Sequence, residues 1–327
     1  MIETKDGTTT NNVAGRARRV QGRSAQVSVN GPVNGEIVSV NTIGKGDMTC
    51  AEIARQEIIL DVLQGQTSLL SQPFFQRIWL PHGPMSWPKQ DDKILEPSIY
   101  FPGRALNISQ GMAVEKILSA DDDNQVVVIH GPPGTGKTTV IAAAVTSFHH
   151  ADHERPVWIA AQSNVAVKNI AEKLCAVDFH NFKLLISKDF HNFKLLISKD
   201  FHFDWCVRFP SELLFLMISN RHEHLYGDIL QARLIRSDEL SKDIVGAERQ
   251  LLDARVVLCT LAMLSSPFIT PYTRIAPVHT IIFDEASQIE VGDYIPAIRH
   301  FSSTLRKMVF IGDNKQCLYL SSSMTSG

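Results

Sequence analysis

The stretch Gly131-Pro-Pro-Gly-Thr-Gly-Lys-Thr138 decides the fold class of this chain. It fits the pattern Gly-x-x-x-x-Gly-Lys-Ser/Thr, and it lies between an apolar run, Val126 to Ile129, and a segment with helical periodicity, Lys137 to Phe148. Glycines in such a turn let backbone amides close around phosphate oxygens, and the start of the helix adds positive charge. The sequence therefore predicts an α/β fold with a parallel sheet and flanking helices; an incidental glycine-rich turn is the alternative.

The same loop predicts the residues of a nucleotide site. Lys137 is expected to reach the β- and γ-phosphates, and Thr138 to offer its hydroxyl to Mg²⁺. The other residues expected to bind the nucleotide are Gly131, Pro132, Pro133, Gly134, Thr135, Gly136 and Thr139. We therefore expect ATP and Mg²⁺ at this loop.

Two adjacent acids follow a second apolar strand, Thr280-Ile-Ile-Phe-Asp-Glu285. Strand ends are where an open α/β sheet presents groups to its ligand. Asp284 is expected to hold Mg²⁺ through its water shell, and Glu285 to orient and deprotonate the attacking water. The alternative is that the acids simply favour the start of a helix.

Short apolar runs alternate with amphipathic helical patterns from Gln125 onward, as in a parallel sheet with crossover helices. The predicted strands are Val126–Ile129, Val157–Ala161, Phe182–Ile186, Val256–Cys259, Thr280–Phe283 and Met308–Ile311. The predicted helices are Lys137–Phe148, Val165–Val177 and Ile229–Leu252. Most of the strands are apolar throughout, which indicates burial on both faces of the sheet.

Residues 1 to 105 have a β-rich texture, with short strands predicted at Ala25–Val29 and Glu36–Val40. Four arginines lie here with no acidic residue between Gly7 and Gly35: Arg16, Arg18, Arg19 and Arg23. They indicate either a surface that contacts phosphates or an ordinary solvated strand edge, and the sequence does not separate these two interpretations.

The bulk composition excludes several protein classes. The chain has 327 residues, 44% of them hydrophobic, and a net charge of -2, so no chain-wide basic field indicates a nucleic-acid partner. Its five cysteines form no Cys-x-x-Cys pair, which argues against a zinc knuckle or a secreted disulfide framework. Neither a secretory signal nor a membrane span is expected, and an intracellular compartment, cytoplasmic or nuclear, fits best. His149, His150 and His153 indicate a solvated helix end rather than a metal site.

An 11-residue repeat interrupts the α/β pattern: Asp178 to Lys188 reads DFHNFKLLISK, and Asp189 to Lys199 repeats it unchanged. Two such short units are too few for a solenoid, so a duplication or an assembly error is the better interpretation. Both copies offer the same strand, so they compete for one position in the sheet. The histidines at 180, 191 and 202 follow from the repeat and are not a ligand set.

The string Asp284-Glu-Ala-Ser-Gln288, followed by Phe310-Ile-Gly-Asp-Asn-Lys-Gln316, resembles motifs II and III of superfamily-1 helicases of the nonsense-mediated-decay and immunoglobulin-mu-binding type. Three further segments agree with this resemblance. Leu106-Asn-Ile-Ser-Gln110 resembles the Q motif, Ala161-Gln-Ser-Asn-Val-Ala-Val167 resembles motif Ia, and Val257-Leu-Cys-Thr-Leu261 resembles the motif that follows it.

The resemblance implies roles for several residues, each beside a structural alternative. Gln110 is implied to read the adenine, or else lies on a solvated helix face. Gln316 is implied to sense the γ-phosphate as part of the catalytic set, and Asp313 to link the ATP site to the strand path. The residues implied to contact single-stranded RNA or DNA are Ser163, Asn164 and Thr260. Ser163 and Asn164 also fit a helix N-cap, with both roles compatible, and Thr260 fits a simple strand end.

A resemblance of this kind implies an ATP-dependent nucleic-acid helicase with a RecA-like P-loop NTPase domain over residues 106–327, after an accessory β-rich, barrel- or stalk-like region, residues 1–105. Relatives continue into a second RecA-like domain, whose arginine completes the ATP site; without it, slow hydrolysis and no translocation are expected. The insert Cys206 to Arg221 splits a stretch that is continuous in relatives, so strand pairing over 178–221 is expected to be disrupted; a retained intron is our hypothesis for it.

The alternative function is a nucleotide-binding regulatory module without turnover. A ring-forming ATPase of the AAA type shares the glycine loop, but the motif II and III strings argue against it.

Overall fold

The computed structural model describes residues 2–6, 9–13, 15–21, 24–29, 31–40, 48–80, 87, 97–186 and 229–313. The chain forms two compact units, Met1–Met48 and Thr49–Gly327. Within the described ranges, no helix combines the length and the apolar character needed to cross a bilayer.

The N-terminal unit is built of short antiparallel strands. They are β1 (Ile2–Asp6), β2 (Thr9–Val13), β3 (Gly15–Gln21), β4 (Ser24–Val29) and β5 (Glu36–Val40). The first sheet has the order β2-β1-β5, and β3 pairs with β4 in a separate hairpin. The strands predicted at residues 25–29 and 36–40 are therefore confirmed.

The second unit contains a seven-stranded sheet in which all recorded pairs are parallel. Its strands are β6 (Val126–His130), β7 (Val157–Ala161), β8 (Phe182–Ile186), β9 (Leu234–Arg236), β10 (Val256–Thr260), β11 (Thr280–Asp284) and β12 (Lys307–Gly312). Their order is β6-β12-β11-β7-β10-β8-β9. All six predicted strands are present, and the expected RecA-like α/β fold is confirmed.

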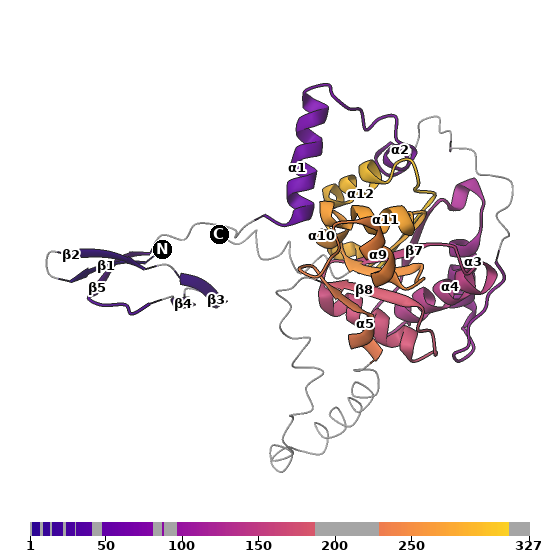
Figure 1. Ribbon diagram of the computed structural model, residues 1–327, viewed down its shortest axis with the longest axis horizontal. Helices are drawn as coiled ribbons and strands as arrows, with labels where there is room; N and C mark the ends of the chain where they lie inside the picture. The colour runs from indigo at the N-terminus through magenta and orange to yellow at the C-terminus, as the bar shows by residue number, and fades with distance from the viewer. Residues whose placement is uncertain are drawn as a thin grey trace, which may run out of the picture. The chain divides into compact units, whose positions relative to one another are not determined.

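Two helical layers enclose this sheet (Figure 1). One layer holds α3 (Ile108–Leu118), α4 (Lys137–Ala151) and α5 (Asn164–Cys175). The other holds α1 (Cys50–Leu63), α2 (Pro73–Trp79), α9 (Ile244–Leu251), α10 (Leu261–Leu264), α11 (Thr270–Ile275) and α12 (Ile295–His300). Alternate residues of each strand enter opposite layers: Ile282 faces the first core, whereas Ile281 and Phe283 face the second. This double burial explains the unbroken apolar runs.

The predicted single helix Ile229–Leu252 is wrong. Residues 229–233 are helical, β9 follows at once, and α9 begins only at Ile244. Ile235 is buried where β9 pairs with β8, and the side chain of Asp243 accepts a hydrogen bond from the amide of Gly246 (2.7 Å) to start a new helix. Pairing at the open edge of the sheet overrides the local helical preference.

Helices α1 and α2 lie within residues 1–105, where only a β-rich texture is predicted. Thr49 and Glu52 form a capping box that starts α1, and Ala51 and Phe74 enter the core beneath the sheet. These helices belong to the unit that begins at Thr49, so the division in the structure falls well before residue 105.

The first copy of the repeat supplies β8, which lies between β10 and β9. The second copy and the insert Cys206 to Arg221 lie outside the described residues, so the predicted competition between the copies stays a prediction.

Candidate active site

The residues of the candidate site follow the carboxyl ends of neighbouring parallel strands. Strand β12 lies between β6 and β11, and its Gly312 is in register with His130, the residue before the glycine loop. In the adjacent pairs, Asp284 and Thr260 are both in register with Ala161. The glycine loop, the two acids and the motif Ia segment therefore emerge at one edge of the sheet, where open α/β folds bind their ligands.

The glycine loop has the backbone conformation that a phosphate cradle requires. Gly134 and Gly136 have φ of 80° and 85°, a region that side chains rarely adopt. The amide of Gly131 donates to the carbonyl of Gly312 (3.0 Å), which ties the loop to β12. Lys137 donates from Nζ to the carbonyls of Gly131 (2.7 Å) and Pro132 (3.3 Å), so its charge lies within the loop.

The remaining loop residues divide by exposure. Pro132, Pro133, Gly134 and Thr135 are exposed, Gly136 and Thr138 are half-buried, and Thr139 is buried under the first turn of α4. Thr138 is the second residue of α4, close to the positive end of the helix. An exposed loop backed by a lysine and a helix start fits a nucleotide phosphate chain with its magnesium ion.

Asp284 is only 7% exposed at the end of β11. The pKa of its carboxyl is raised to about 6, mainly by burial and also by the negative charge of Glu285, while a hydrogen bond from the Glu285 backbone and the charge of Lys137 oppose this rise. Lys137 thus acts on Asp284 across β12, which brings the loop and the acid into one electrostatic site. An oxygen ligand beside this loop is a donor that Mg²⁺ favours.

Glu285 has a left-handed backbone, with φ 51° and ψ 35°. Such a conformation costs roughly 1–3 kcal/mol for a residue other than glycine, so neighbouring contacts must hold it. The short helix η4 (Ala286–Gln288) follows it, and the amide of Gln288 donates to the carbonyl of Glu285 (2.8 Å). Gly312 packs against this turn so closely that an added Cβ would lie 2.9 Å from the amide nitrogen of Ser287.

Gln110 supports the glycine loop directly. Its side chain is 8% exposed, so the alternative of a solvated helix face is wrong. Its Nε2 donates to the carbonyl of Thr135 (2.9 Å), and its Oε1 accepts from the amide of Asn107 (3.1 Å) in a capping box. The predicted contact with adenine stays a prediction.

The three residues implied to contact nucleic acid lie on β7 and β10 or just beyond them. Ser163 is the N-cap of α5 and accepts from the amide of Ala166 (3.1 Å), and Thr260 likewise caps α10 by accepting from the amide of Met263 (3.2 Å). The capping alternative is therefore confirmed for Ser163, and Thr260 is also the strand end that its alternative expected. Asn164 has a buried Oδ1 without a hydrogen-bond partner in the structure, so its side chain is no cap. Of the three, only Ser163 is exposed.

Asp313 is buried at the end of β12, and its amide donates to Oγ of Ser287 (3.3 Å). Ser287 therefore links the segment after β12 to the turn after Glu285, a contact that the sequence analysis did not predict although both residues lie in the quoted motif strings. Gln316 lies outside the described residues, so its predicted role is untested.

The histidines at the end of α4 are not simply solvated. His149 is half-buried, its Nε2 lies 3.1 Å from Nδ1 of His153, and the ring of His150 stacks on Tyr100. With Asp178 and His180 they line a cavity of about 380 Å³. Among the described residues, no group of three or more His, Cys, Asp or Glu side chains is arranged to hold a metal ion.

Comparison with known proteins identifies the family. The model of a family described as AAA domain matches residues 105–190 and 219–318. The unmatched stretch between these ranges contains nearly all of the second copy of the repeat and most of the insert. The match covers more than half of the chain.

The chain is 28% identical over 225 residues to the DNA polymerase alpha-associated DNA helicase A of Saccharomyces cerevisiae, covering 64% of this chain and 32% of that protein. It is 28% identical over 228 residues to the ATP-dependent helicase upf1 of Schizosaccharomyces pombe, covering 64% of this chain and 22% of that protein. A solved structure, the UvsW helicase from bacteriophage T4, shares 13% identity at a TM-score of 0.38, covering 81% of this chain and 71% of that one.

The chain thus spans a third or less of the length of these two curated relatives. The matched segments contain the glycine loop and the motif strings quoted above. The chain belongs to the AAA domain family and, within it, to the superfamily-1 helicases of the Upf1-like type.

Proposed function

We propose that the chain provides the ATP-binding and hydrolysis site of an ATP-dependent nucleic-acid helicase. One observation carries this proposal: the glycine loop with Lys137, and the acids Asp284 and Glu285, meet at one edge of the sheet. In this assignment residues from Thr49 onward form the ATPase domain, and the N-terminal strands form an accessory region.

We assign a separate chemical role to each group of residues in the site. The loop amides and Lys137 bind and orient the β- and γ-phosphates, and Thr138 and Asp284 hold the magnesium ion, which supplies charge stabilisation at the phosphates when bound. Glu285 orients the attacking water and accepts its proton, because its carboxylate follows Asp284 on a fixed turn. Gln110 keeps the loop in shape through the carbonyl of Thr135.

In this proposal, residues at the same edge of the sheet contact single-stranded RNA or DNA. Exposed Ser163 offers its amide and hydroxyl beside β7, next to the strand that ends in Asp284. Contacts of this type bind the phosphate backbone and do not read bases, so we propose binding without strong sequence preference. The relatives include proteins whose names specify RNA and proteins whose names specify DNA, so the proposal covers both nucleic acids.

Turnover of ATP tests this function, measured with and without single-stranded RNA or DNA. Lys137→Ala is expected to weaken nucleotide binding by roughly tenfold or more, because a charge-assisted hydrogen bond contributes about 1.5–3 kcal/mol. Glu285→Gln is expected to keep binding and to lower turnover by about 10²–10⁴-fold, the usual contribution of a general base.

Lys116→Ala and Glu115→Gln are matched controls on the exposed face of α3, and both should behave as the wild type. Nucleic-acid-stimulated turnover supports the helicase assignment. Binding that Lys137→Ala weakens, without any turnover, would instead support a nucleotide-binding regulatory module. Binding that Lys137→Ala leaves unchanged would overturn both.

A further inference from the structure

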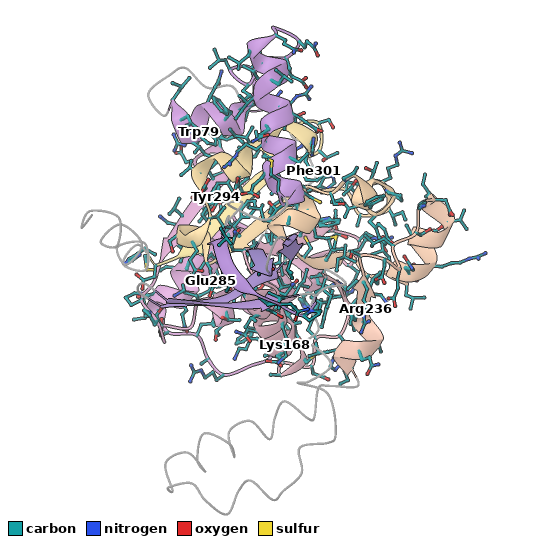
Figure 2. All side chains as sticks on the ribbon, turned by 90° about the vertical axis from the view of Figure 1, so that its left-hand side faces the viewer. Trp79, Lys168, Arg236, Glu285, Tyr294 and Phe301 are labelled. Atoms are coloured by element: carbon teal, nitrogen blue, oxygen red, sulfur yellow. The ribbon has the colours of Figure 1, made fainter. Side chains whose placement is uncertain are left out.

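A tyrosine, Tyr294, also holds the strained turn at Glu285; both residues are labelled in Figure 2. Tyr294 lies at the end of the short helix η5 (Val291–Tyr294), and its hydroxyl donates to the carbonyl of Ala286 (2.9 Å). That carbonyl belongs to the residue immediately after Glu285. A single hydroxyl therefore contacts the backbone of the turn that carries the Glu285 carboxylate.

The ring of Tyr294 is fixed by two other aromatic rings. It meets Phe283 of β11 and Phe310 of β12 edge-on, with centroids 4.9 Å and 5.0 Å away, while these two rings stack on each other at 5.3 Å. The side chain is only 5% exposed. These edge-to-face contacts with one side chain from each strand restrict the Tyr294 ring. The hydroxyl is therefore held close to the carbonyl of Ala286.

Asp293, the residue before Tyr294, forms an ion pair with Arg55 of helix α1. Nη1 of Arg55 lies 2.7 Å from Oδ1 of Asp293 and 2.8 Å from Oε2 of Glu290. The Arg55 side chain also passes close to Gly292, where an added Cβ would be 3.2 Å from its Cδ. The Arg55–Asp293 pair is the less exposed of the two, so solvent screens it less than the pair with Glu290.

We propose that Tyr294 and Arg55 are positioning residues for the catalytic carboxylates: Tyr294 sets the turn at Glu285, and Arg55 makes that turn depend on the placement of α1. This inference rests on the proposed function of Asp284 and Glu285. A displacement of helix α1 (Cys50–Leu63) is therefore expected to act, through Asp293 and Tyr294, on the turn at Glu285.

The first test uses hydrogen–deuterium exchange on the full chain without nucleotide. The amides of Gln288 and Ile289 donate to carbonyls within the turn. In Tyr294→Phe, which keeps the ring and removes the hydroxyl, their exchange is expected to accelerate about two- to tenfold, the effect of losing one neutral hydrogen bond. Arg55→Gln should accelerate the same amides, and Arg55→Lys should restore part of the protection because it keeps the charge but not the fork of donors.

Two variants serve as matched controls. Tyr100→Phe removes a hydroxyl from a ring that stacks on His150. Arg255→Gln breaks an ion pair with Glu154 (2.7 Å) that lies at the amino edge of the sheet. Both should leave exchange in the turn unchanged. Unchanged exchange in Tyr294→Phe would overturn the inference whatever the protein does with nucleotide.

The second test separates positioning from general loosening. Binding of a fluorescent ADP analogue is titrated with Mg²⁺. In Tyr294→Phe the affinity without Mg²⁺ should equal that of the wild type, because the glycine loop is intact, whereas the Mg²⁺ concentration for half-maximal tightening should rise about two- to tenfold. Equal loss of affinity with and without Mg²⁺ would show a merely structural role. If the wild type binds no nucleotide, the proposed function fails while the exchange test still decides the Tyr294 contact.

Discussion

At the scale of single residues, Gly136 shows how closely the candidate site is packed. Its φ is 85°, and a Cβ placed there would lie 2.4 Å from Nε2 of Gln110, the group that donates to the carbonyl of Thr135. Gly136→Ala therefore both strains the backbone and displaces a buried carboxamide. We expect it to lower the free energy of unfolding by about 1–3 kcal/mol and to weaken nucleotide binding.

Gly111→Ala is the matched control for Gly136→Ala. Gly111 lies inside α3, one residue after Gln110, and an added Cβ would meet nothing within 4 Å. Alanine is favoured over glycine in a helix by up to about 1 kcal/mol, so this variant should be slightly stabilised. Urea denaturation of both variants checks the pair; equal stability of Gly136→Ala and the wild type would contradict the role assigned to the loop geometry.

The residues of the site differ in how far sequence alone predicts them. The pattern around Lys137 and the strand that ends at Asp284 follow from local spacing, and the structure brings the two together. The hydrogen bond from Gln110 to the carbonyl of Thr135 joins residues only 25 positions apart. It depends on the burial of Gln110, which no local sequence pattern predicts. Arg55 contacts Asp293 across 238 positions, and nothing in either local sequence indicates the other. Such contacts arise from the packing of α1 against the second core.

At the scale of elements, the carboxyl end of α4 makes the stability of the fold depend on pH. Burial lowers the pKa of His149, the charge of His153 lowers it further, and Asp152 and Glu154 partly oppose this. A histidine whose pKa is lower in the folded state takes up its proton more readily when unfolded. Its contribution to stability is therefore complete above the unfolded pKa near 6.5 and is lost as the pH falls toward the folded pKa.

Thermal unfolding at pH 7.5 and 5.5 tests this prediction. His149→Gln removes the titrating group, so the loss of Tm between the two pH values should be smaller than in the wild type. His150→Gln, which alters the exposed neighbour stacked on Tyr100, should keep the pH dependence of the wild type. A pH dependence of the same size in His149→Gln and the wild type would contradict the assignment.

Element prediction succeeded for the strands, most of which are buried on both faces; the edge strand β6 is an exception, since its Val128 is 74% exposed. The six predicted strands carry apolar residues at every position or nearly so, a pattern that burial in a parallel sheet favours. The predicted helix Ile229–Leu252 failed because β9 has only three residues and its strand character comes from pairing with β8. Helix α1 was missed for a related reason: it has apolar residues on its buried face, such as Ile58, and on its exposed face, such as Leu63, so its helical periodicity is weak.

At the scale of the whole molecule, the described members of the two hydrophobic cores belong to one unit. Among the residues whose burial the structure describes, every member of both clusters lies at or beyond Ala51. Burial of apolar surface is the dominant favourable contribution to folding. The nucleotide-binding unit should therefore fold without the strands that precede it.

A chain that begins at Met48 tests this independence. It retains the capping box at Thr49 and the ion pairs of Arg55, so α1 keeps both its start and its attachment to Asp293. We expect its Tm to lie within a few degrees of the full chain, since surface changes away from a core usually alter stability by about 0.5 kcal/mol or less. Affinity for the ADP analogue should also be unchanged, because Lys137 and Asp284 lie in the retained unit. A shortened chain that fails to fold, or that folds and loses nucleotide affinity, would contradict this independence.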